Sequence, residues 1–208
     1  SVLSLFTSAE GQEIKNQNTF LHPSMLDSVL LFHFDIKLYH MNNIHSDLIT
    51  SNADISLNYI VFSHVNGFQN NTDLFNKCIN IISQNPKMSF WYAKTILNGR
   101  FEPGEKAIST KSNYSYSYAN QVLNGRFELG EEAISTDVFY SISYARQIIK
   151  GKFELGEKNI STDAYYSYIY AKYVLNDRFE LGESQIRNNP TRKVLYNEFI
   201  STLGYPCI

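Results

Sequence analysis

The residues best suited to acid–base or metal chemistry are five histidines, and all of them lie in the first third of the chain. They are His22, His33, His40, His45 and His64. A helix would place His33 and His40 on one face because they are seven residues apart. A metal site needs more ligands at fixed geometry. We therefore interpret these histidines as ordinary buried or surface residues and expect no metal and no cofactor.

The possible nucleophiles are two cysteines and a set of Ser-Thr pairs. Cys78 and Cys207 are far apart and form no Cys-x-x-Cys pair, so neither a zinc site nor a disulfide framework follows. The hydroxyl pairs are Ser109-Thr110, Ser135-Thr136 and Ser161-Thr162. Such residues are typical of turns and helix caps. An enzyme would need a nucleophile with a base, paired carboxylates in a cleft or a metal constellation, and no motif in the sequence meets these demands, so we expect a protein that is not an enzyme.

Aromatic side chains recur at a fixed spacing and are suited to binding. Tyr114, Tyr140 and Tyr166 are equally spaced along the chain, and helical geometry places Trp91 and Tyr173 on the same side. Stacked aromatics give a large, rigid and half-polar contact area that suits a protein loop or peptide. This pattern predicts a partner-binding edge. The alternative is that these tyrosines fill the groove between adjacent repeat units.

A second recurring set is basic and consists of Arg100, Arg126, Lys152 and Arg178. One cation in each repeat would suit a helical repeat protein that binds one RNA base per repeat. Glutamates keep the same period, at positions 102, 128, 154 and 180 and at 105, 131, 157 and 183. Ion pairing within the protein explains the cations better, at ~0.2–1 kcal/mol for each exposed pair. The net charge of −2 also gives no bulk attraction to nucleic acid, which remains the alternative partner.

These side chains belong to tandem repeats with a period of twenty-six residues. Sliding the chain by one period aligns Phe101, Phe127, Phe153 and Phe179. Residues 127–152 and 153–178 share 13 identical positions, whereas unrelated sequences match at about one position in twenty. Ile49, Asn52, Ser56 and Tyr59 fit the repeat at a different offset, which indicates degenerate copies in the first half.

The sequence pattern of each repeat predicts one long and one short helix. The long helix, of thirteen residues, begins after a capping residue, which is Asn85, Asp137, Asp163 or Asn189, and Pro86 and Pro190 suit its first position. We expect it to end at Gly99, Gly125 or Gly151 in the left-handed conformation, with Asp177 as an exception. A shorter helix covers residues 129–135 in its clearest copy. The long helix buries a stripe centred on Ala145, which is equivalent to Ala93, Ala119 and Ala171.

The predicted fold is all-α, a right-handed α-solenoid of short helix-turn-helix repeats with degenerate N-terminal repeats and a capping helix. Residues 1–22 look irregular. Residues 23–74 hold the capping helix, near 24–41, and the degenerate repeats. The tandem repeats cover residues 75–200, and residues 201–208 form a C-terminal tail.

The strings Tyr-Ala, Gly-Arg-Phe and Leu-Gly-Glu resemble short tandem helical repeats of bacteriophage and other viral proteins of unassigned role. The resemblance covers about residues 75–185. The architecture is also similar to tetratricopeptide-like solenoids, although this unit is shorter and lacks their Trp-Leu-Gly-Tyr signature. The resemblance implies an α-solenoid without a transferable active site. It suggests a phage-encoded factor that binds, and inhibits, a host protein.

We expect a protein partner, with single-stranded RNA as the alternative, and no membrane partner. No run approaches the ~18 apolar residues of a membrane span. The first ten residues lack the basic start and long apolar stretch of a signal peptide. We therefore expect a cytoplasmic protein, in the host cytoplasm if it is viral, that is a monomer or a homodimer.

Overall fold

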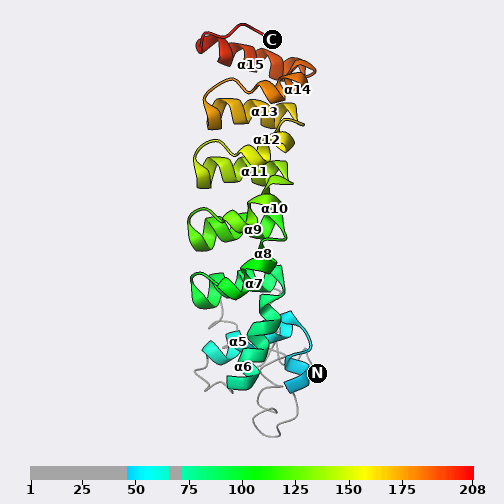
Figure 1. The fold of residues 1–208 in the computed structure, drawn as a ribbon, viewed down its shortest axis with the longest axis vertical. Coiled ribbons are helices and arrows are strands. Elements are labelled where there is room, and N and C mark those ends of the chain that lie inside the picture. Colours follow the sequence, from blue (N-terminus) through cyan, green and yellow to red (C-terminus); the bar gives the residue numbers. More distant parts are fainter. Residues whose placement is uncertain (1–45, 66–71) are drawn as a thin grey trace, which may run out of the picture. The chain divides into compact units, whose positions relative to one another are not determined.

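The computed structural model describes residues 46–65 and 72–208, and every regular element in these residues is a helix. The predicted all-α class is confirmed, and neighbouring helices pack against each other. The segments predicted as irregular (1–22) and as a capping helix (24–41) lie outside the described residues. The chain divides into two compact units, residues 1–107 and 108–208. Figure 1 shows the described helices, coloured along the sequence.

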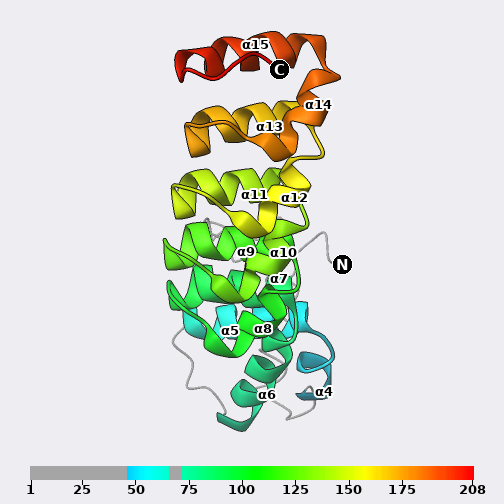
Figure 2. The same cartoon turned by 45° about the horizontal axis from the view of Figure 1, so that its top comes forward.

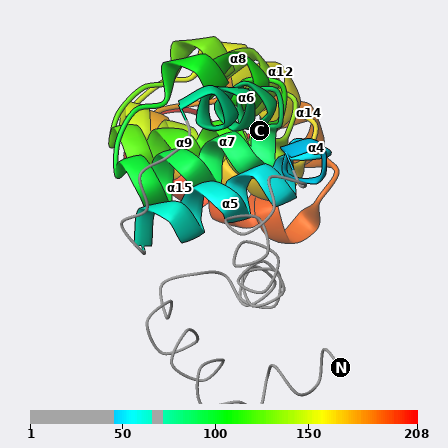
Figure 3. The same ribbon diagram turned by 90° about the horizontal axis from the view of Figure 1, so that it is seen from below.

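The described part of the first unit contains three mutually contacting helices and several further elements (Figure 3). Its elements are α4 (Ser46–Ile49), α5 (Ala53–Val65), α6 (Thr72–Ser83), α7 (Pro86–Tyr92), the π-helical turn η1 (Ala93–Leu97) and α8 (Glu102–Ile108), whose last residue belongs to the second unit. Leu57, Ile60, Ile82 and Met88 are fully buried among them. These side chains form the core that holds α5, α6 and α7 together.

The second unit alternates long and short helices. A long helix is an α-helix together with the π-helical turn that follows it, or α15 by itself. Its elements are α9 (Ser112–Tyr118), η2 (Ala119–Leu123), η3 (Glu128–Gly130), α10 (Glu131–Ser135), α11 (Val138–Tyr144), η4 (Ala145–Ile149), α12 (Glu154–Ile160), α13 (Ala164–Tyr170), η5 (Ala171–Leu175), η6 (Glu180–Gly182), α14 (Glu183–Arg187) and α15 (Pro190–Thr202). Helices α9, α11, α13 and α15 lie side by side in one row (Figure 2). The short helices α10, α12 and α14 form a second row next to them.

The long helices begin where the sequence predicts, because a short polar side chain caps the first turn. Asp137 accepts a hydrogen bond from the Tyr140 amide at 3.0 Å, and Asp163 accepts one from Tyr166 at 2.9 Å. Asn85 and Asn189 cap α7 and α15 in the same way and are each followed by proline. Lys111 takes this place before α9 and makes no side-chain cap bond. Each cap satisfies an amide that the helix itself leaves unpaired.

The helix ends differ from the prediction. Gly99, Gly125 and Gly151 do not adopt the left-handed conformation. The residue before each glycine adopts it instead, and so does Asn176 before Asp177. The left-handed residues are therefore Asn98, Asn124, Lys150 and Asn176. Each long helix except α15 widens into a π-helical turn, and where a glycine follows, its amide closes the turn by donating to an alanine carbonyl six residues back, as from Gly125 to Ala119 at 3.1 Å. This wider closure places the left-handed residue one position earlier, and asparagine tolerates that conformation well. Asp177 is therefore no exception, because Asn176 already makes the turn.

The core of the second unit follows the predicted alanine stripe. Ala119, Ala145 and Ala171 are fully buried, and a buried serine precedes each by four residues. These serines donate to the carbonyl that ends the preceding short helix, for example Ser141 to Ile134 at 3.1 Å. Ser56 makes the same bond to Ile49 at 2.9 Å in the first unit. Long and short helices are therefore joined by buried side-chain bonds as well as by apolar packing.

Glycine is required where a short helix crosses a long one. A β-carbon at Gly130 would lie 2.5 Å from the ring of Phe127 and 2.7 Å from the β-carbon of Ser115. Both neighbours are buried, so they have little room to move. The Leu-Gly-Glu string thus places the short helix in direct contact with the long helix before it.

Candidate functional site

The basic set that recurs in the sequence is bound by buried glutamates. Arg126 donates two hydrogen bonds to the carboxylate of Glu131, each of 2.9 Å, although the Glu131 side chain is only 8% exposed. The Tyr144 hydroxyl donates to the same carboxylate at 2.9 Å and accepts a hydrogen bond from the Phe127 amide at 2.9 Å. We call this group of four residues a polar junction. It ties α11 to the turn and short helix before it.

The same polar junction recurs along the second unit. Tyr170 links Glu157 to the Phe153 amide at 3.0 and 2.8 Å. Tyr196 links Glu183 to the Phe179 amide at 3.1 and 2.9 Å. Tyr144, Tyr170 and Tyr196 are fully buried. The hydrogen bonds of their hydroxyls were not predicted from the sequence.

The electrostatics of the junctions keep the tyrosines neutral and favour the charged form of Glu183. Burial raises the pKa of Tyr144 to about 12, so its hydroxyl keeps the proton that it donates to Glu131. Hydrogen bonds from Arg178 hold the pKa of the Glu183 carboxyl below its ordinary value. The junction with lysine is looser, because Lys152 Nζ lies 3.9 Å from Glu157 and that side chain is 17% exposed.

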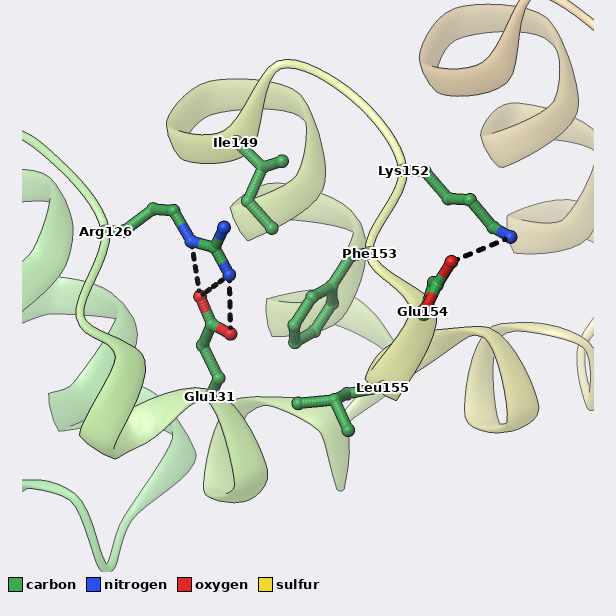
Figure 4. A pocket seen from close by; sticks show the side chains of 7 residues that line it. All are labelled: Arg126, Glu131, Ile149, Lys152, Phe153, Glu154 and Leu155. Carbon is green, nitrogen blue, oxygen red and sulfur yellow. Dashed lines mark hydrogen bonds and ion pairs between the residues drawn. The ribbon is translucent and has the colours of Figure 1, made fainter.

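A cavity of about 320 Å³ lies between two of these junctions (Figure 4). Arg126 and Glu131 pair on one side of it, Lys152 and Glu154 pair on the other at 3.3 Å, and Phe153 lies between them. Ile149 and Leu155 complete its lining. Each cation of the cavity already has a carboxylate partner.

The basic residues predicted for nucleic-acid binding are thus engaged within the protein. Arg100 pairs with Glu105 at 2.7 Å in the first unit, and Arg178 pairs with Glu183 at 2.9 Å in the second. The predicted ion pairing is confirmed for all four cations. A phosphate chain would have to compete with these carboxylates for every cation.

The hydroxyl pairs considered as nucleophiles take part in helix ends. Ser135 donates to the Glu132 carbonyl and Thr136 to the Ala133 carbonyl, both at 2.7 Å. Ser161 and Thr162 make the equivalent bonds. In residues 46–65 and 72–208 no group of three His, Cys, Asp or Glu side chains is placed to hold a metal ion. His64 is exposed, and the other four histidines lie outside the described residues.

The predicted aromatic edge lies on the solvent side of the long helices and is only partly exposed. Tyr114, Tyr140, Tyr166 and Trp91 are half-buried, whereas Tyr173 is 55% exposed. The Tyr140 ring lies 5.6 Å from the ring of Tyr116 on the neighbouring helix α9. The two interpretations left open by the sequence therefore both apply to Tyr140, which partly fills the groove between helices and partly faces solvent.

Two aromatic residues that were not predicted from the sequence are more exposed than Tyr114, Tyr140, Tyr166 and Trp91. Phe139 is 55% exposed and Tyr165 is 44% exposed, and they occupy equivalent positions in α11 and α13. Arg146 is exposed as well, and its guanidinium lies 5.7 Å from the centre of the Tyr173 ring. The outer face of the long helices comprises Tyr116, Asn120, Phe139, Arg146, Gln147, Tyr165, Lys172 and Tyr173.

The outer face is held by contacts between neighbouring long helices and within them. Tyr116 on α9 donates a hydrogen bond to the Gln147 side chain on η4 at 3.0 Å. Lys172 lies 5.4 Å from the Tyr173 ring centre and donates to the buried Tyr168 hydroxyl at 3.0 Å, which raises the Lys172 pKa. Cations over aromatic rings are attracted by about 0.5–1 kcal/mol at exposed sites. The side chains of the outer face are thus ordered before any partner arrives.

No helix among the described residues is long and apolar enough to cross a membrane. No protein-family model matches the chain, and no curated protein or solved structure matches it either. The functional assignment therefore has to be made from the arrangement of its own side chains.

Proposed function

We propose that the chain is a non-enzymatic, right-handed α-solenoid that binds another protein through the outer face of its long helices. One observation carries this proposal: Phe139, Tyr165 and Tyr173 are large aromatic residues that are each 44–55% exposed on neighbouring helices. Soluble proteins usually keep few such groups together at the surface unless they contact a partner. Aromatic anchors also supply much of the binding energy of protein interfaces.

The repeating contacts support the solenoid part of the proposal. The polar junctions occur at Phe127, Phe153 and Phe179, each bonded to a tyrosine 17 residues later. One type of junction thus recurs once in each repeat, and the long helices of neighbouring repeats also contact each other, as in other stacked repeat proteins. A row of helices built in this way presents a rigid surface, which limits the entropy lost on binding.

A second exposed row provides a matched control for the binding test. Leu129, Leu155 and Leu181 are 56–58% exposed, belong to the short-helix row and recur once in each repeat. A triple Leu→Ser variant therefore removes a similar apolar area from a different side of the repeats. Phe139→Ser, Tyr165→Ser and Tyr173→Ser together form the test variant.

The wild-type chain and both triple variants are immobilised, checked for helix content by circular dichroism, and used to capture proteins from an extract of the source cells. We expect to capture a protein that binds both the wild type and the leucine variant. Its affinity for the aromatic variant should be at least about tenfold lower than for the wild type, because each anchor contributes roughly 1 kcal/mol or more. Equal capture by the folded aromatic variant contradicts the proposal. So does recovery of nuclease-sensitive material alone, or capture of no protein by the wild type.

A further inference from the structure

Charges in the second unit are sorted between its two rows of helices. Three of its long helices, residues 112–123, 138–149 and 164–175, contain no Asp or Glu. The short helices 128–135, 154–160 and 180–187 each contain at least two glutamates. The sorting is not a matter of bulk charge, because the whole chain has a net charge of only −2. The outer face therefore has a local positive potential within a nearly neutral protein.

Two cations on this face have no carboxylate partner among the described residues. Arg146 and Lys172 both contact the Tyr173 ring, at 5.7 and 5.4 Å, and neither forms an ion pair there. This distinguishes them from Arg126 and Lys152, which the glutamates of the short helices neutralise. Their charge is available to a ligand that brings its own anions.

Two exposed tyrosine rings of the outer face are covered by cations. Tyr173 contacts both Arg146 and Lys172, and Arg192 lies 4.7 Å from the ring centre of Tyr165. Binding of single-stranded nucleic acid depends on bases that stack on open aromatic faces. Tyr165 and Tyr173 are therefore poorly placed to stack on bases, and the cations over them present N–H donors at the surface instead.

Side-chain amides lie beside the cations. Gln147 is exposed next to Arg146, and the Tyr116 hydroxyl donates to its amide oxygen at 3.0 Å, which leaves its NH₂ group to donate outward. Asn120 occupies the position equivalent to Arg146 on the neighbouring helix. An amide carries both a donor and acceptors, so it matches the peptide groups of an extended chain. Cations and amides together favour a peptide with acidic side chains.

We propose that the outer face binds an extended, acidic peptide segment of a partner protein, with its carboxylates on Arg146 and Lys172. This inference rests on the proposed function and specifies the chemistry of the partner. Guanidinium and ammonium groups bind carboxylates by charge-assisted hydrogen bonds. The aromatic residues position the two cations and supply apolar contact area.

Fluorescence anisotropy with the full chain tests this proposal. The probe is a labelled peptide of alternating Glu and Ser, compared with the same peptide carrying Gln for Glu and with an oligouridylate of equal length. The test variant is Arg146→Gln with Lys172→Gln. The matched control is Lys111→Gln with Lys158→Gln, which removes two exposed positive charges elsewhere in the same unit.

We expect the wild-type chain to bind the acidic peptide and to bind the Gln peptide more weakly. The test variant should bind the acidic peptide about fivefold more weakly than the wild type, whereas the control variant should change this affinity less than about twofold. Raising the salt concentration should reduce the difference between the peptides. The proposal is wrong if the acidic peptide does not bind, if both double variants lose affinity equally, or if oligouridylate binds more tightly than the peptide. A partner captured through Phe139, Tyr165 and Tyr173 would still support the proposed function in each of the first two cases.

Discussion

Removal of one hydroxyl group from the Tyr144 junction tests whether the polar junctions hold the fold together. Tyr144→Phe deletes the acceptor of the Phe127 amide and the donor to Glu131, both at 2.9 Å. Tyr144 is fully buried and Phe127 is only 3% exposed, so no solvent replaces the lost bond to the amide. An unpaired buried polar group costs about 1–3 kcal/mol. Glu131 keeps its two bonds to Arg126, so we expect a total loss of about 2–3 kcal/mol.

Urea unfolding followed by far-ultraviolet circular dichroism measures this loss. Tyr140→Phe is the matched control, because it removes the same atom from the same helix and the Tyr140 hydroxyl makes no hydrogen bond with the described residues. We expect the control to change the unfolding free energy by less than about 0.5 kcal/mol. An equal urea midpoint for both variants, with an unchanged slope, would refute the stabilising role of the junction.

Two further predictions concern packing and pH. Gly130→Ala places a β-carbon 2.5 Å from a buried phenylalanine ring, so we expect the free energy of unfolding to fall by about 1–3 kcal/mol in thermal unfolding. A β-carbon at Gly151 would have no atom within 4 Å, so Gly151→Ala should leave the Tm unchanged or raise it. Equal Tm values for the two variants would contradict the close approach at Gly130. Because the folded-state pKa of Glu183 is lowered by Arg178, its stabilising contribution is present above the ordinary pKa of 4.5 and is lost as the pH falls through the folded value. Glu183→Gln should therefore reduce the dependence of the urea midpoint on pH in this acidic range, and an unaltered dependence would argue against the ion pair.

Local features of the fold could be predicted because they depend on residues close in sequence. Asp137 caps α11 through an amide three residues later, and the alanine equivalent to Ala145 is buried in every copy, as the helical periodicity indicates. The left-handed residue was placed wrongly because Asn124 and Gly125 both tolerate that conformation. The π-helical closure decides between them, and Lys150 adopts the conformation although lysine does not favour it.

The candidate site could be predicted only in outline. The sequence pattern located the aromatic side of the long helices, but not which rings are exposed, because Tyr140 and Tyr116 come from different helices whose separation is set by packing. A usable signal was overlooked: residues 112–123, 138–149 and 164–175 lack Asp and Glu entirely. That observation identifies Arg146 and Lys172 as cations without acidic neighbours in their own helices. Their contacts with Tyr173 required the positions of the side chains in space.

The spacing within the polar junctions bears on how such a chain changes length during evolution. The Phe127 amide and Glu131 are bonded to a tyrosine 17 and 13 residues later, so all members of a junction fall within one period of the repeat. A genetic deletion of residues 127–152 would join Arg126 directly to Phe153. Arg126 would then face Glu157 and Tyr170, and a complete junction with an arginine would result. Unequal recombination between copies in register therefore adds or removes whole units without leaving a buried polar group unpaired. Recombination out of register would break a junction and is the event that selection would remove.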